Sequence, residues 1–215
     1  PAGLRRIKSM DIQYSGLVLG LHETRSFPVF DTFAARMAET HFVNNDFARG
    51  APQASLGFRV PGVRALALGA GFSRAYDFNY RYDEAPRNVD NSIMGRNVVG
   101  STGSVNQIGF GVAWAPVSWA GLGASVALLQ GDAKWTATKS TAVSVLQTAT
   151  TEVNTTDMKG TALTVGVQAQ PFREIGLPWV DLGASVRLPY DLTGSQVIKT
   201  VIVIGTTTTS GSASR

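Results

Sequence analysis

Few residues in this chain of 215 have a type and spacing suited to chemistry. The only histidines, His22 and His41, lack a metal-ligand or catalytic-triad setting. Cysteine is absent, which excludes disulfides, thiolate metal sites and cysteine nucleophiles. Asp77 and Asp83 are too isolated to suggest paired general acid–base catalysis. We therefore expect no enzymatic activity, no metal site and no cofactor.

Sequence signatures of nucleotide binding, of hydrolase nucleophiles and of nucleic-acid binding are also missing. The chain has no phosphate-binding loop and no nucleophile elbow. Gly69-Ala70-Gly71 is not followed by the rest of a dinucleotide fingerprint, and it lies within an expected strand. The net charge is +4, but the basic residues are scattered except for Arg5, Arg6 and Lys8. Because nucleic-acid binders carry a focused basic stripe, we expect no nucleic-acid partner.

The composition favours strands over helices. Charged residues make up 16% of the chain, against a usual ~25%. Glycine makes up about 11%, from 23 of 215 residues, against a usual ~7%. The long uncharged stretch from Asn97 to Gly131 contains Pro116 and many glycines, which disfavour a helix. Its apolar residues alternate with small ones, which indicates strands with two different faces.

A hairpin with alternating faces occurs three times. Ile108, Phe110, Val112 and Trp114 share one face of a strand, and a second strand follows a turn at Pro116. The same unit surrounds Pro61-Gly62 upstream and the prolines 171 and 178 downstream. The return strands read Leu-Gly-Ala-Gly-Phe from Leu68 and Leu-Gly-Ala-Ser-Val from Leu122 and from Leu182. This similarity indicates a repeated hairpin, with chance identity in a glycine-rich chain as the alternative.

The links between the hairpins predict a membrane barrel. Turns within hairpins are short, whereas the segments 22–54, 82–104 and 133–159 are long and polar. This wiring is typical of outer-membrane barrels, with short periplasmic turns and long extracellular loops. Within the first link, residues 30–47 have helical spacing with Asp31 as N-cap. We expect one short helix there, lying over the barrel mouth or packed against its rim.

The two strand faces point to lipid as the solvent of the apolar one. One face holds large apolar residues, and the other holds mainly Gly, Ala, Ser, Thr and Gln with few charges. A soluble half-buried sheet usually carries Lys and Glu on its wet face, whereas a barrel in lipid turns its large residues outward. The alternative is a soluble β-barrel that binds lipid inside.

The strand that starts near Leu66 suggests where the membrane ends. Its even positions are apolar and aromatic up to Tyr82, except for Arg74, which could snorkel to headgroup phosphates. We therefore predict the membrane-interface residues to be Arg74, Tyr76, Phe78, Tyr80 and Trp114. The odd positions of the same segment predict a path through the lumen at Asp77, Asn79 and Arg81.

The first strand contains a change of phase. Met10, Ile12 and Tyr14 share one face, but Leu17, Leu19 and Leu21 have the other parity. A β-bulge near Ser15-Gly16 would restore a single apolar face, and two separate short strands would also explain the change.

The opening Pro1-Ala2-Gly3-Leu4, the basic residues after it and the repeated Leu-Gly-Ala strands resemble FadL/TodX-type outer-membrane transport proteins. The resemblance implies a barrel of about fourteen strands with an N-terminal plug, through whose wall hydrophobic compounds pass. We expect about seven strands here, so residues 1–215 would form a single partial barrel domain without the plug. Related barrels that serve as secretion partners share the same opening.

Together, these features predict an all-β fold, an antiparallel transmembrane β-barrel in the outer membrane of a Gram-negative bacterium. Its expected partners are membrane lipid, lipopolysaccharide and hydrophobic small molecules such as long-chain fatty acids. The alternatives are a structural or secretion-partner barrel and the soluble lipid-binding barrel.

Overall fold

The computed structural model describes residues 4, 7, 9–63, 65–87, 92–143, 146–170 and 180–214. These residues form one antiparallel sheet of eleven strands, which confirms the all-β prediction. Among them, no helix is long and apolar enough to cross a membrane. The strands are β1 (Met10–Phe30), β2 (Arg36–Arg59), β3 (Leu66–Asp77), β4 (Tyr80–Glu84), β5 (Gly95–Trp114), β6 (Ala120–Val143), β7 (Leu146–Ala169), β8 (Leu182–Arg187), β9 (Leu192–Thr193), β10 (Gln196–Ile204) and β11 (Thr207–Ser214).

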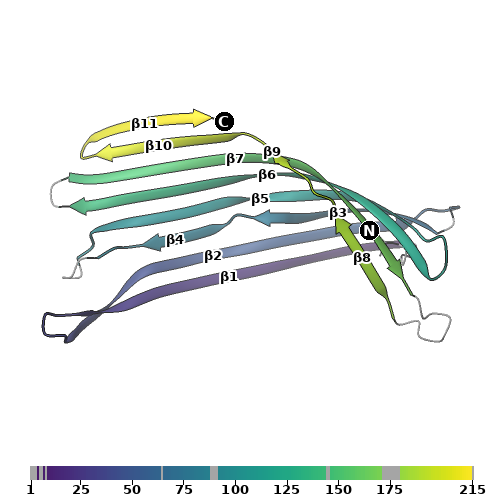
Figure 1. Ribbon diagram of the computed structural model, residues 1–215, viewed down its shortest axis with the longest axis horizontal. Coiled ribbons are helices and arrows are strands. Elements are labelled where there is room, and N and C mark those ends of the chain that lie inside the picture. Colours follow the sequence, from purple (N-terminus) through teal and green to yellow (C-terminus); the bar gives the residue numbers. More distant parts are fainter. Residues whose placement is uncertain are drawn as a thin grey trace.

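The strands follow one another as a meander (Figure 1). The order across the sheet is β1-β2-β3-β5-β6-β7-β10-β11. The short β4 pairs with β2 and β5, and β8 and β9 pair with different parts of β7. The sheet is not closed into a barrel, so β1 and β11 remain as its edges.

The long polar links predicted as loops are mostly strand. β1 and β2 pair through most of 22–54, and β6 and β7 pair through 133–159. Threonines stabilise the second extension by facing each other across it: the hydroxyls of Thr138 and Thr151 lie 3.2 Å apart, and those of Thr141 and Thr148 also hydrogen-bond. Thr pairs on opposite strands favour pairing, so a polar, Thr-rich segment can be sheet.

The helix predicted over residues 30–47 is wrong. β1 ends at Phe30 and β2 starts at Arg36, so the segment contains a hairpin turn and the start of a strand. Asp31 caps that turn instead of a helix, because its Oδ1 accepts hydrogen bonds of 2.8 Å from the N–H groups of Phe33 and Ala35. Backbone pairing with β1 outweighs the weak amphipathic pattern of the segment.

The phase change in the first strand comes without the predicted bulge and without a break into two strands. Pairing is regular from Met10 opposite Phe58 to Arg25 opposite Val43. Leu17, Leu19 and Leu21 therefore lie on the face opposite to Met10 and its partners, and apolar side chains are exposed on both faces of β1. The regular pairing with β2 fixes the register of β1 here, so no slip compensates for the change of phase.

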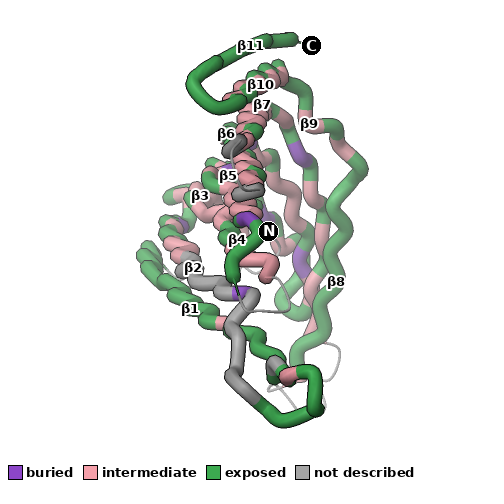
Figure 2. Tube along the Cα trace, turned by 90° about the vertical axis from the view of Figure 1, so that its left-hand side faces the viewer, coloured by how far each residue is buried: buried purple, intermediate pink, exposed green. Residues whose placement is uncertain are grey.

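The sheet curls strongly, so that β8 and β9 stand opposite its first strands (Figure 2). Two contacts show the curl. The hydroxyls of Tyr76, on β3, and Tyr190, after β8, lie 2.6 Å apart. Arg187 at the end of β8 donates a hydrogen bond of 3.3 Å to Gln107 Oε1 on β5. Because β6 and β7 lie between these strands in the sheet, the face that carries Arg187 and Gln107 is concave.

Candidate functional site

The convex surface, called here the outer face, carries a continuous set of large apolar side chains. The strand register aligns one residue from each of seven strands in a single row: Met10, Phe58, Leu68, Val112, Ala124, Val165 and Val186. The next row contains Ile12, Leu56, Ala70, Phe110, Val126 and Leu163. The register confirms the alternation predicted for these hairpins, since residues directly opposite in an antiparallel pair share a face.

The concave surface, called here the inner face, carries small and polar residues. One of its rows contains Gly57, Gly69, Gly111, Ser125, Thr164 and Arg187. Burial is the reverse of a soluble sheet. On the outer face, Phe110 is 51% exposed and Leu163 is 43% exposed, whereas Ala113 and Ala162 on the inner face are 0% and 1% exposed. An apolar surface of this extent marks a site of contact with a membrane or another protein.

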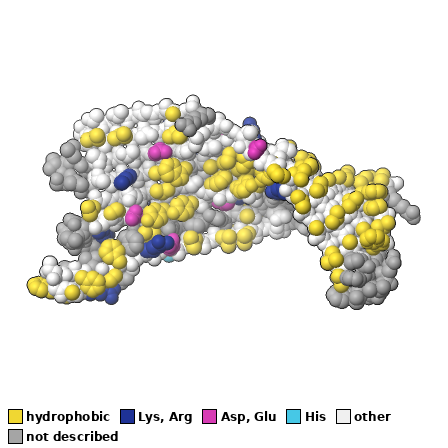
Figure 3. Space-filling model, viewed as in Figure 1, with side chains coloured by type: hydrophobic (Ala, Val, Ile, Leu, Met, Phe, Trp, Pro, Cys, Tyr) yellow, Lys and Arg dark blue, Asp and Glu magenta, His cyan; other side chains and the backbone are white. Residues whose placement is uncertain are grey.

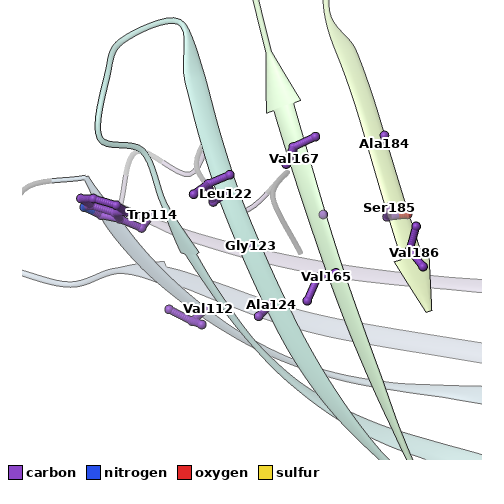
Figure 4. Close-up of a pocket in the computed structure, with 11 residues that line it drawn as sticks. Val112, Trp114, Leu122, Gly123, Ala124, Val165, Val167, Ala184, Ser185 and Val186 are labelled. Carbon is purple, nitrogen blue, oxygen red and sulfur yellow. The ribbon is translucent and has the colours of Figure 1, made fainter. Parts of the chain in front are cut away.

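Hydrophobic side chains gather at the end of the molecule that carries β8, among other uncharged groups (Figure 3). A shallow hollow of about 520 Å³ lies between β5, β6, β7 and β8 at this end. Trp114, Leu122, Val167 and Val186 border it, and the small Ala124 and Ala184 leave it room (Figure 4). The hollow offers apolar contact and no group for acid–base chemistry.

The apolar part of the outer face ends at a row of polar residues. The last apolar row contains Phe72, Ile108 and Leu128. The next row on the same face, two positions away toward the same end of the sheet, contains Arg74, Asn106 and Gln130. From Trp114 to Asn106 the strand advances by eight residue steps, or ~26 Å at ~3.3 Å per step. A strand tilt near 40° makes this ~20 Å of height, close to the ~25 Å apolar band of known barrels.

The prediction for residues 76–82 placed the side chains on the wrong faces. A register shift between Arg74 and Tyr76 inserts Ala75 as an extra residue, so Tyr76 pairs with Val105 on the inner face and Asp77 pairs with Ser104 on the outer face. The reversal continues in β4, where Tyr80 is opposite Ser101 and Arg81 is opposite Gly100. A bulge of one residue exchanges the faces of everything beyond it.

The register therefore leaves some of the residues predicted for the interface on the outer face and turns others to the inner face. Trp114 stays on the outer face, half exposed. Tyr76 and Phe78 stack with centroids 6.4 Å apart, and Phe78 packs against the inner apolar cluster of Val105, Leu129 and Ala162.

Arg74 and Asp77 form an ion pair of 2.9 Å, and Arg74 also donates to the carbonyl of Gly50. The N–H of Asn79 donates to Asp77 at 2.9 Å, which closes the turn between β3 and β4. Asp77 and Arg81 do not line the inner face, so the register removes the argument for placing them on a lumen path.

The sequence did not single out the polar contacts that cross the inner face. Gln107 Nε2 donates to Ser73 Oγ at 2.7 Å and its oxygen accepts from Arg187, whose guanidinium lies 6.0 Å from the ring centroid of Tyr190. The only sequence signal was a charged residue, Arg187, on an otherwise small-residue face. The contacts themselves depend on the curl of the sheet.

The inner face also holds the start of the chain. An added Cβ on Gly57 would overlap Ile7 Cδ1, and one on Gly69 would lie 2.9 Å from Leu4 Cδ2. Gly57 and Gly69 are directly opposite each other, so the absence of their side chains provides the space for Leu4 and Ile7. Pro1 to Gly3, the basic residues Arg5, Arg6 and Lys8, and prolines 171 and 178 lie outside the described residues.

Beyond the apolar band, an ion pair between Asp83 on β4 and Arg96 on β5 links the two strands. Arg96 Nε donates to Asp83 Oδ1 at 2.7 Å, and its second nitrogen bonds the other carboxylate oxygen. These hydrogen bonds and the positive charge of Arg96 lower the pKa of Asp83 below its ordinary value. Since the folded pKa is the lower one, the pair stabilises the fold at neutral pH, and this contribution is lost as the pH falls through the folded pKa.

We expect Asp83→Asn to lower the free energy of unfolding by about 0.5 kcal/mol at pH 7, the scale of a solvent-accessible ion pair. The difference from the original protein should shrink as the pH falls through the lowered pKa of Asp83, and denaturant titrations at a series of decreasing pH values measure it. Asp11→Asn is the matched control, because Asp11 accepts a hydrogen bond from Gln13 and forms no ion pair in the described part of the chain. A deficit that stays the same as the pH falls would contradict this role of Asp83.

Within the described residues, no group of three or more His, Cys, Asp or Glu side chains could hold a metal ion. Comparison of the chain with protein-family models, with curated proteins and with solved structures found no match.

Proposed function

We propose that this protein is an outer-membrane β-barrel of a Gram-negative bacterium that takes up hydrophobic compounds such as long-chain fatty acids. The observation that carries the proposal is the outer face, an apolar surface that continues over seven strands while the opposite face is small and polar. Lipid is the solvent that stabilises such an arrangement, because transferring this surface to water would be costly.

Closure is a further part of the proposal. In hydrocarbon every backbone N–H and C=O must be paired, and only a closed barrel satisfies this for a sheet. We therefore infer that additional strands pair with the edges β1 and β11 in the membrane. The curl of the sheet supports this, since it already brings β8 opposite β3 and β5.

Uptake would proceed by diffusion along the inner face, with no cofactor. On that face Val105, Leu129 and Ala162 form a buried cluster, and the half-buried Tyr190 and Leu192, which pack against it, leave apolar surface accessible among the polar residues. A hydrophobic molecule that leaves lipopolysaccharide could exchange one apolar surface for another there. Leu4 and Ile7 occupy part of the same face, so they would narrow the passage.

The test is expression of the complete protein in a Gram-negative host that lacks its own fatty-acid uptake. We expect the protein to sediment with the outer membrane and to restore uptake of radiolabelled oleate. The variant with alanine at Asp77, Asn79 and Arg81 should retain uptake, because the register places Asp77 and Arg81 on the outer face. An outer-membrane protein without uptake would refute transport and favour a structural or secretion-partner role. A protein that remains monomeric in water without detergent would refute the barrel as well.

A further inference from the structure

We propose that the inner face contains a carboxylate-binding site, formed by Arg187 with the hydroxyls of Tyr76 and Tyr190, that holds the head group of an amphipathic acid. This inference rests on the proposed uptake function and specifies the chemistry of its ligand. The site lies at the end of β8 and just after it, where Tyr190 contacts Tyr76 on β3 and Arg187 contacts Gln107 on β5.

Arg187 is an exposed cation that lacks an acidic partner. Its contacts are one hydrogen bond of 3.3 Å to the amide oxygen of Gln107 and the ring of Tyr190 at 6.0 Å. None of the ion pairs within the described part of the chain includes it. Its guanidinium carries five donors in a fixed plane, and a carboxylate can accept two of them side by side. Most donors of Arg187 therefore remain available to a ligand.

The two tyrosines add a neutral donor beside this cation. Their hydroxyl oxygens lie 2.6 Å apart, so one O–H donates to the other and the second O–H is free to donate elsewhere. A hollow of about 570 Å³ adjoins them, bordered by Tyr76, Arg187, Leu188, Pro189, Tyr190 and Leu192. Asp191 also borders the hollow but forms no ion pair with Arg187, so it does not neutralise the guanidinium.

Apolar residues begin directly next to these polar groups. Phe78 stacks on Tyr76, and Tyr190 and Leu192 pack against the cluster of Val105 and Leu129. A cationic group beside an apolar surface suits an amphipathic acid, with its carboxylate at Arg187 and its chain along Leu188, Pro189 and Leu192, which border the hollow. A neutral hydrophobic molecule would contact only the apolar surface and not Arg187.

The experiment measures binding of a fluorescent polyene fatty acid, cis-parinaric acid, and of its methyl ester to the complete protein in detergent at about pH 8.5, where the acid is ionised. We expect the original protein to bind the acid more tightly than the ester. Arg187→Gln should lower affinity for the acid by about tenfold and leave the ester unchanged, since a charge-assisted hydrogen bond is lost. Arg187→Lys, which keeps the charge, should retain most of the affinity for the acid.

Arg59→Gln is the matched control, because Arg59 lies on the inner face, opposite Ala67, and away from the tyrosines. Unchanged acid binding in Arg187→Gln, or equal losses for acid and ester, would overturn the site. If the original protein binds acid and ester equally, the carboxylate site is refuted while uptake of hydrophobic compounds stands. If it binds neither, both proposals fail.

Discussion

Val126→Arg should lower the free energy of unfolding by ~2–4 kcal/mol in lipid vesicles, the cost of an arginine at the middle of a lipid-facing band. Val126 lies opposite Phe110 and Leu163, midway between Trp114 and the polar row that contains Asn106. An arginine there has the longest distance to either boundary, so its side chain cannot reach water easily. Denaturant titration of the vesicle-inserted protein measures the loss.

Ser125→Arg is the control at the adjacent position on the inner face. Ser125 is opposite Gly111 and Thr164, where polar and small side chains surround it. We expect a smaller loss there, because a wet interior can solvate the guanidinium. Equal losses from the two variants would argue against the assignment of the faces. If the outer face met water, Val126→Arg would change stability by no more than about 0.5 kcal/mol, as ordinary surface substitutions do.

Gly57→Leu should release the start of the chain from the inner face. Even a single added carbon at Gly57 would overlap Ile7 Cδ1, so a leucine side chain takes the space of Ile7. Because the chain contains no cysteine, Leu4→Cys supplies a single thiol for labelling in the same segment and leaves Ile7, which meets the new leucine, in place. We expect a water-soluble maleimide to label that thiol about tenfold faster when Gly57→Leu is also present, since labelling reports the population with the segment displaced.

Gly16→Leu is the comparison for this experiment. Gly16 is also a strand glycine, but an added Cβ there meets no atom within 4 Å. The labelling rate of Leu4→Cys should therefore remain the same in this background. Fast labelling before any glycine is replaced would show that Leu4 and Ile7 do not stay on the inner face.

Local alternation predicted the short hairpins well. The rows through Leu68, Val112, Ala124 and Val186 have the faces expected from the sequence. In these strands each residue's face depends only on whether its position is odd or even, as long as the strand is regular. Large apolar residues at alternate positions and glycine, alanine or serine between them were therefore enough to indicate which side chains are exposed together.

The tertiary structure alone decided where that alternation stops or reverses. Ala75 could have continued β3 in phase, but its pairing with β5 leaves it as an extra residue, so Tyr76 faces inward and Asp77 faces outward. The expected helix at 30–47 became part of a hairpin for a similar reason, because β2 gains backbone hydrogen bonds along β1.

The sequence by itself determined the all-β class, the two faces of each short hairpin and the absence of cysteine chemistry. The curl that brings Tyr190 to Tyr76 and Arg187 to Gln107 joins residues 114 and 80 positions apart. Local periodicity contains no information about such distances. Register, bulges and curl depend instead on which strand edges pair and on the backbone hydrogen bonds that this pairing completes.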